Sequence, residues 1–404
     1  MRPVFFIFLT VLIDSIGIGI IFPVSATIVS EVTGQPIENA ATEGGMLMFT
    51  YALMQFIFAP VLGGLSDRYG RRPVLLLSLF GLGLDYLILF YAPTYTWLII
   101  GRLIAGMCGG SFTTAFAYIA DITPAEKRAQ SFGIMGAAFG LGFIIGPFIG
   151  GLFSDISSRA PFMAAAVLSL LNFLYGLFIL PESLVKENRR SFDIKRANPF
   201  GAFVHLNKMK SVRVLVLVMF MLYLAGQVMP VIWTFYTKYL FTWTDKQVGY
   251  SLAFVGLMVA IVQGGLIRIA QQKLGQIPSV LIGFILYFSG LMLFAFANQE
   301  WMMYAFTAVY ALGGIGPPTI QSLISSQIPA NEQGEIQGVL TSLTSLATIL
   351  SPLLMSGLFT AFTGKDAIYE FPGVSFFASA IIILLAGLIF LSQIGRIKSS
   401  SPSK

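Results

Sequence analysis

Three ionisable side chains stand in stretches of the sequence that are otherwise apolar. Asp14 lies in "VLIDSIGIGIIFPV", Asp85 in "LFGLGLDYLILFYAP" and Arg102 in "GRLIAGMCGG". Burying an ionised group is costly unless it is paired, and a buried carboxyl can take up and release a proton as its surroundings change. We predict that Asp14 and Asp85 bind a proton or a cation in competition, with Arg102 biasing the balance. A purely structural Asp85–Arg102 pair is the alternative.

The elements that must position these residues are membrane-spanning helices. Of the 404 residues, 56% are hydrophobic and 10% are charged, and the mean hydropathy is +0.83. Apolar runs near 20 residues can cross a hydrocarbon core about 30 Å thick. Twelve such runs occur, at residues 4–30, 44–66, 73–92, 95–120, 129–152, 161–180, 212–238, 246–268, 278–297, 301–326, 334–361 and 371–395. The sequence therefore predicts an all-α, multi-pass membrane protein.

The basic residues indicate how the chain is oriented. Cytoplasmic loops of membrane proteins carry an excess of Lys and Arg. With the N-terminus inside, 19 of the 24 Lys and Arg residues are cytoplasmic, four lie outside and one, Arg102, lies within a span. The net charge of +6 is thus a topology signal and does not indicate nucleic-acid binding. We expect a protein of the inner (plasma) membrane with both termini cytoplasmic.

The longest polar segment divides the chain into two halves. It predicts an N-terminal six-helix bundle over residues 1–180, a cytoplasmic linker over 181–211 and a C-terminal six-helix bundle over 212–404. We expect the linker to be a tether, with a lipid or regulatory contact as the alternative. His205, within it, is expected to have no chemical role.

The two halves also repeat at a single offset. A shift of 205 residues places Pro147 on Pro352. Duplicated units are typical of transporters, in which the substrate site lies between the halves near the bilayer midplane. The residues that this shift places opposite the three charges are Met219, Gly290 and Thr307. The second half therefore lacks those charges, and we expect its role to differ.

Helix geometry allows Asp85 and Arg102 to meet. Each lies about seven residues from the outer end of its span, which is on the order of 10 Å below the outer surface at 1.5 Å per residue. Their spans are consecutive and antiparallel, so the two charges can pair at one depth. Asp14 lies near mid-depth in the first span, with no evident basic partner.

A charged loop joins the second and third spans. The sequence "GGLSDRYGRRPVLL" places Asp67, Arg68, Arg71 and Arg72 at the cytoplasmic ends of two helices. A glycine-bounded loop can turn tightly and form charge-assisted hydrogen bonds. We predict that this gating loop latches the inward-facing end, against Asp121 at the end of span four. Simple anchoring by positive charge is the alternative.

Span five carries a stripe of small residues. The sequence "GLGFIIGPFIGG" places Gly142, Gly146 and Gly150 at intervals of four, with Pro147 and Gly151 beside them. Small residues at this spacing let helices approach closely. Helix packing is thus at least part of their role.

Together these motifs resemble the major facilitator superfamily. The loop fills its signature Gly-x-Leu-x-Asp-Arg-x-Gly-Arg-Arg, Arg102 and Gly106 match its span-four signature, and "GFIIGPFIGG" is similar to the motif of its drug/proton antiporters. More narrowly, the sequences around Asp14 and Asp85 and "GGIGPPTIQSLIS" look like the tetracycline/proton antiporter branch. The resemblance implies the major facilitator fold of two six-helix bundles, functional intramembrane carboxylates at Asp14 and Asp85, and an essential Asp67.

One position departs from that branch. Its members carry a functional histidine in span eight, and the matching position here, counted from Gln263 and Gly275, is Val259. A chelated tetracycline–metal cation would be served by a polar group there. We therefore expect weak or absent tetracycline transport and a preference for another amphiphilic, cationic compound. Arg102 leaves an anionic substrate as the alternative.

The second half supplies neutral polar groups within its spans. Neutral polar groups in an apolar cavity suit an amphiphilic organic molecule. The candidate residues of such a substrate cavity are Tyr223, Gln227, Gln263, Tyr287 and Gln321.

The predicted function is proton-coupled export of a small amphiphilic compound, as in drug efflux, by a secondary transporter that is not an enzyme. One cysteine and one histidine exclude a disulfide framework and a histidine-rich metal site, and no Walker motif appears. We expect a monomer in the lipid bilayer that binds substrate and protons, with no cofactor, metal or nucleic acid. The alternatives are a proton-coupled importer or exporter of a metabolite such as an amino acid or siderophore, and a membrane sensor. A sensor would need a soluble signalling domain, and no polar segment of this sequence is long enough to form one.

Overall fold

The computed structural model describes residues 2–124, 127–192, 212–329, 332–365, 367 and 369–400. Within these ranges, eleven helical segments are long and apolar enough to cross a membrane. The pair α15 (Glu300–Gly313) and α16 (Gly316–Ser326) covers the remaining predicted run. The twelve-span prediction is therefore confirmed, and the chain is a multi-pass helical membrane protein.

Seven of the predicted spans are single helices. They are α3 (Ile37–Tyr69), α4 (Arg71–Tyr91), α7 (Arg128–Phe153), α8 (Ala160–Ile179), α14 (Gln276–Ala295), α17 (Gln333–Thr363) and α18 (Val374–Ser400). The 33 residues of α3 correspond to about 50 Å at 1.5 Å per residue, which exceeds the hydrocarbon thickness.

The other spans are divided. The first apolar run forms α1 (Arg2–Ile21) and a short α2 (Ser25–Thr33), and the fourth forms α5 (Tyr95–Cys108) and α6 (Ser111–Ile122). The seventh forms α10 (Arg213–Gly226) and α11 (Val228–Phe241). The eighth contains α12 (Asp245–Ile261), the π-helical turn η3 (Val262–Leu266) and α13 (Ile267–Leu274). Single π-helical turns within α-helices are frequent at functional sites.

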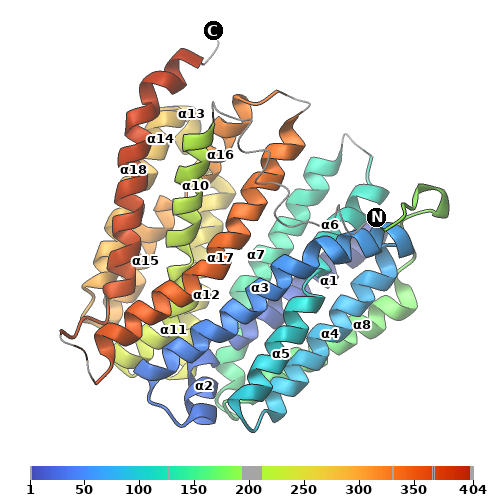
Figure 1. The fold of residues 1–404 in the computed structure, drawn as a ribbon, viewed down its shortest axis with the longest axis horizontal. Helices are drawn as coiled ribbons and strands as arrows, with labels where there is room; N and C mark the ends of the chain where they lie inside the picture. Colours follow the sequence, from blue (N-terminus) through green and yellow to red (C-terminus); the bar gives the residue numbers. More distant parts are fainter. Residues whose placement is uncertain are drawn as a thin grey trace. The chain divides into compact units, whose positions relative to one another are not determined.

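The helices, drawn in Figure 1, form two compact units. Unit 1 comprises Met1–Pro199 and Trp243–Gly256, and unit 2 comprises Phe200–Thr242 and Leu257–Lys404. The first part of α12 thus packs with unit 1. The bundle boundaries at 180 and 212 stay a prediction, and residues 193–211, including His205, lie outside the described residues.

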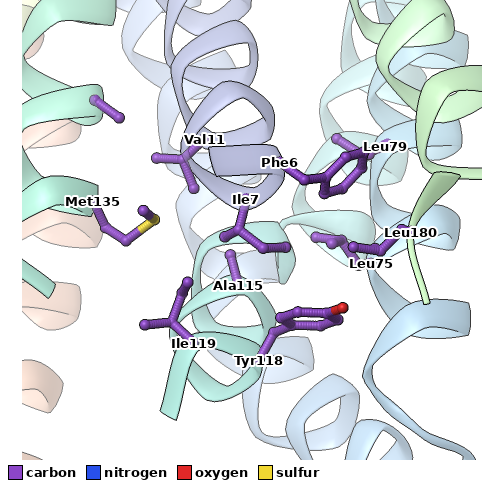
Figure 2. Packing of buried hydrophobic residues seen from close by; sticks show 11 residues of the cluster. Phe6, Ile7, Val11, Leu75, Leu79, Ala115, Tyr118, Ile119, Met135 and Leu180 are labelled. Carbon is purple, nitrogen blue, oxygen red and sulfur yellow. The ribbon is translucent and has the colours of Figure 1, made fainter. Parts of the chain in front are cut away.

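Unit 1 has an apolar core at the end where α1 and α4 begin and α6 and α8 end, which we call the loop end. Figure 2 shows this core, in which side chains from several helices converge. Its fully buried members include Ile7 on α1, Leu75 on α4 and Tyr118 on α6. The Tyr118 hydroxyl donates to the Pro181 carbonyl at 2.9 Å, which fixes the end of α8 against α6.

Candidate functional site

Asp85 and Arg102 form an ion pair inside unit 1. Asp85, on α4, is 0% exposed, and an Arg102 Nη2 from α5 donates to its Oδ2. The other carboxylate oxygen lies against Gly101, where an added Cβ would be 2.7 Å away. The structure thus confirms that the two charges meet. Their role in proton coupling stays a prediction.

Arg102 also faces an aromatic ring that the sequence reasoning missed. Its guanidinium carbon lies 5.9 Å from the ring centroid of Tyr51 on α3, within the range of a cation–π interaction. The Gln55 amide, one turn further along α3, donates to the Tyr51 hydroxyl at 3.3 Å and to the Gly109 carbonyl at 3.1 Å. Gly109 lies in the break between α5 and α6. The spacing of Tyr51 and Gln55 on one helix face was the available signal.

Asp14 has a different kind of partner. It is 4% exposed on α1 and accepts a hydrogen bond from the hydroxyl of Ser111, the first residue of α6. The two acids are therefore held by the two parts of one divided span. Arg102 on α5 pairs with Asp85, and Ser111 on α6 binds Asp14, so a displacement at the break would affect both carboxyl groups.

The gating loop forms a network centred on Arg71. Arg71 Nη1 lies 2.6 Å from Asp67 Oδ1, and its Nε lies 3.0 Å from Asp121 Oδ2. Arg72 donates to the Leu177 carbonyl at 2.6 Å, and Arg68 lies over the Tyr69 ring at 5.0 Å. The structure therefore brings Asp67, Arg71 and Asp121 together, whereas Arg68 and Arg72 contact other groups.

Glu182, directly after span six, completes this loop and was not predicted. Its Oε1 accepts from the Arg71 backbone N–H at 2.8 Å, and its Oε2 accepts from that of Arg72 at 3.3 Å. A carboxylate at this place also interacts favourably with the N-terminal dipole of α4. Gly70 has φ 108°, which favours glycine, and a Cβ there would collide with the Glu182 carboxylate. The available signal was an acidic residue at the start of a segment that is basic overall.

The first residues of the linker lie on this loop. The Arg190 backbone N–H donates to the Asp67 carbonyl at 3.1 Å, and a Cβ on Gly64 would lie 3.0 Å from the Phe192 ring. The Ser183 hydroxyl donates to Asp121 Oδ2 at 3.1 Å. The described part of the linker therefore packs closely on the gating loop, and its role as a tether stays a prediction.

The glycine stripe on α7 fits against α1, the helix that carries Asp14. A Cβ on Gly146 would lie 2.8 Å from the Gly19 Cα, and additions at Gly142 and Gly150 would collide with Ser15 and with the Ile20 carbonyl. These glycines thus let the two backbones approach, as the packing interpretation predicts.

The last residues of the motif face α12 instead. A Cβ on Gly151 would lie 3.2 Å from the Gly249 Cα, and one on Gly249 would collide with the Pro147 carbonyl. Nearby, Lys246 Nζ forms an ion pair with Asp155 Oδ2 at 2.6 Å. The motif therefore holds α7 between α1 and the first part of α12.

In unit 2, three of the five predicted cavity residues lie on or beside α10. Tyr223 hydrogen-bonds Thr344, and the Gln227 amide donates to the Thr348 hydroxyl at 3.2 Å. Tyr287, on α14, pairs with the Tyr310 hydroxyl at 3.1 Å, and its own hydroxyl would lie 2.8 Å from a Cβ on Gly226. These groups form a polar seam among apolar helices.

The other two predicted cavity residues lie elsewhere in unit 2. Gln321, on α16, donates to Gln337 at 3.0 Å, and Gln263 is exposed within the π-helical turn η3. Val259, one turn before η3, packs on an apolar cluster of Val262, Ala311 and Ile315. Span eight thus presents an apolar contact at the position that the family resemblance assigns to histidine.

Comparisons with known proteins identify the family of the chain. The family model described as Major Facilitator Superfamily matches residues 7–276 and 241–403. The chain is 41% identical to the tetracycline resistance protein, class C, of Escherichia coli, over 87% of this chain and 88% of that protein. It is 37% identical to the class B protein of Escherichia coli, over 94% of both chains.

Solved structures support the fold. A bacterial homologue of the human lysosomal transporter Spinster, solved in an inward-facing and unoccupied conformation, aligns with a TM-score of 0.82 over 100% of this chain and 98% of that one. At 13% identity this likeness bears on the fold alone. The chain belongs to the major facilitator superfamily of membrane transporters, in the branch that contains the tetracycline resistance proteins.

Proposed function

We propose that the protein is a proton-coupled secondary transporter that exports a small amphiphilic, cationic organic compound across the inner membrane. The observation that carries this proposal is the pair of buried carboxyl groups in unit 1, at Asp14 and Asp85. Asp85 pairs with the charged guanidinium of Arg102, whereas Asp14 accepts a hydrogen bond from the neutral hydroxyl of Ser111. The two carboxyl groups therefore differ in the charge of their partner. Such a pair suits successive binding of a proton and a cation.

Transport follows from competition for these carboxyl groups. A proton that enters from outside neutralises a carboxylate, and the cationic substrate then loses its counter-charge and leaves. Return to the inward-facing state releases the proton to the cytoplasm and restores the carboxylate for another substrate. Because each cycle moves a proton inward down its gradient, export can proceed uphill.

Two further elements belong to this proposal. The bundles 1–180 and 212–404 alternate access to the substrate, with both termini cytoplasmic, which the distribution of Lys and Arg supports. The network of Asp67, Arg71 and Asp121 stabilises one conformation of the cytoplasmic end. Its rupture and repair accompany the change of access.

We expect the compounds that this protein transports to differ from those suggested by the names of its relatives. The relatives named tetracycline resistance proteins make tetracyclines the first compounds to test. The apolar surroundings of Val259 favour an amphiphilic cation that needs no polar group at this position. We therefore infer that a chelated tetracycline is a poor substrate and that the polar seam of unit 2 contributes to binding a different compound.

The test is proton-driven flux in proteoliposomes. An imposed pH gradient should drive uphill movement of at least one compound in a panel of cationic, anionic and metabolite-like molecules that includes tetracycline. Asp85→Asn protein in matched liposomes is the control. If only an amino acid or another metabolite is transported uphill, the protein is instead a metabolite transporter. Transport that does not depend on the pH gradient would refute proton coupling.

A further inference from the structure

Eleven buried side chains of unit 1 carry a polar atom without a hydrogen-bond partner in the described part of the chain, and four of them are uncharged side chains within α1, α4, α6 and α8. The atoms of these four are Oγ1 of Thr10, Oγ of Ser78, Oγ1 of Thr114 and Oδ1 of Asn172. None of these residues is more than 2% exposed. Leaving one such group unsatisfied costs about 1–3 kcal/mol, so four of them within one unit require an explanation.

The four residues lie at one level of the unit. Thr10 and Ser78 follow the starts of α1 and α4 by eight and seven residues, and Thr114 and Asn172 precede the ends of α6 and α8 by eight and seven. Each is therefore about 11 Å from the loop end at 1.5 Å per residue. The four helices close a ring, because α1 and α4 each pack against both α6 and α8. Each helix of the ring contributes one of these side chains.

This polar layer adjoins Asp14. Asp14 follows Thr10 by four residues on α1, and Ser111 precedes Thr114 by three on α6, so the hydrogen-bonded Asp14–Ser111 pair lies one turn away on the same helix faces. The Asn172 amide donates to the Thr10 carbonyl at 3.2 Å, which places α8 at the same level. Thr10 and Thr114 thus lie one turn to the loop-end side of the buried acid, and Asn172 lies beside Thr10.

Part of the apolar core of Figure 2 lies between this layer and the loop end. Ile7 and Leu75 precede Thr10 and Ser78 by three residues, and Tyr118 follows Thr114 by four. All three are fully buried members of that core. An acid, a polar layer and an apolar plug therefore follow one another toward the loop end.

We propose that Thr10, Ser78, Thr114 and Asn172 bind internal water that accepts the coupled proton from Asp14. Buried water in proteins typically makes two to four hydrogen bonds to groups that otherwise lack partners, and oxygens from four helices at one level meet that requirement. The inference deepens the proposed function and rests on it. It names the acceptor of the proton on the inward half of the cycle.

The proton step needs no further reactant. The O–H bond of the neutral Asp14 carboxyl breaks, its proton binds to a water lone pair to give hydronium, and the Ser111 hydroxyl stabilises the carboxylate that remains. The plug around Ile7 and Tyr118 separates this water from the loop end, so release to the cytoplasm waits until the helices move. Such an order of events would prevent a proton leak in the closed conformation.

The first test separates proton coupling from substrate movement. Thr10→Val with Thr114→Val keeps the shape of both side chains and removes both hydroxyls. We expect a loss of at least tenfold in substrate-coupled proton uptake by proteoliposomes, with substrate–substrate exchange retained and with coupling restored by the Thr→Ser pair. Thr113→Val is the matched control, since this exposed hydroxyl already donates to the Gly110 carbonyl. Undiminished proton uptake, or an equal fall in exchange, would overturn the proposal.

Two further results keep the inference separate from the proposed function. Failure of the unmodified protein to move protons with any compound would refute the function, and the water site would still be tested by stability. If water binds there, Thr10→Val lowers the unfolding midpoint in mixed micelles, because a bound water loses a partner. A midpoint equal to or above that of the unmodified protein indicates a dry layer. If a sodium gradient drives transport without a pH gradient, the layer is instead a metal-cation site. A dry layer and a sodium site would each contradict the proposal.

Discussion

Removing Arg102 should destabilise the protein by an amount that depends on pH. Arg102→Leu leaves Asp85, which is 0% exposed, without its ion-pair partner. Breaking a buried pair in this way costs about 3–5 kcal/mol. The loss in the free energy of unfolding is smaller if the Asp85 carboxyl stays protonated in the folded variant, because a neutral carboxyl needs no ion-pair partner.

The free-energy cost of keeping Asp85 protonated sets the size of this loss. An ordinary aspartate in an unfolded chain has a pKa near 3.9, and keeping it protonated costs about 1.4 kcal/mol per pH unit above that value. The expected loss is therefore about 4 kcal/mol at pH 7 and about 1.5 kcal/mol at pH 5. The folded variant holds a proton that the unfolded chain releases, so its stability relative to the unmodified protein falls as pH rises.

The assay is equilibrium unfolding in mixed micelles, followed by tryptophan fluorescence at several pH values. The matched control is Asp85→Asn combined with Arg102→Leu, which removes both charges and should recover stability to within about 1 kcal/mol of the unmodified protein. A loss in Arg102→Leu that does not change with pH would refute the reasoning. So would a double variant as unstable as the single one.

Three other predictions concern the loop, the glycine stripe and span eight. Asp67→Asn should slow turnover several-fold while the substrate Kd stays unchanged, because the loop acts on the conformational equilibrium; an equal fall in affinity would exclude a latch. Gly146→Ala should lower the unfolding midpoint, since its Cβ would lie 2.8 Å from the Gly19 Cα, whereas Gly136→Ala on the same helix has open space and should not. Val259→His should increase tetracycline export in a cellular accumulation assay; strong export by the unmodified protein would show that the valine is compatible with this drug.

The spans and the Asp85–Arg102 pair could be predicted because each depends on distance along a helix. A 20-residue apolar run must cross the bilayer, and two charges at equal depth in consecutive spans can reach each other. The break in span four could not be predicted in this way. Gly109 and Gly110 are tolerated within a membrane helix, and the contact that accompanies the break comes from Gln55, 54 residues earlier in the chain.

The partners of Asp14 and of the gating loop were hidden for a related reason. A serine such as Ser111 commonly bonds to its own helix, so its type alone does not indicate that it reaches Asp14. Glu182 follows the last apolar residues of span six, and only the folded chain returns it to the start of α4. Both interactions depend on which helices are neighbours, and hydropathy does not contain that information.

The five predicted cavity residues do not all lie together, because helix rotation is unknown from composition, and the substrate cavity itself stays a prediction. Tyr223, Gln227 and Tyr287 gather beside α10, yet Gln321 pairs with Gln337 and Gln263 lies in a π-helical turn. A polar residue in a span can face a cavity, another helix or lipid headgroups. Sequence separation alone does not distinguish these.

The most direct test of the account measures protons in proteoliposomes with an internal pH indicator as substrate is added. The unmodified protein should move protons opposite to the substrate. Asp14→Asn and Asp85→Asn should each abolish this movement while the variant proteins still insert and fold, since an amide keeps the shape of the carboxyl and cannot titrate. Normal proton movement and uphill transport by both variants would contradict the claim that these two acids couple protons to export.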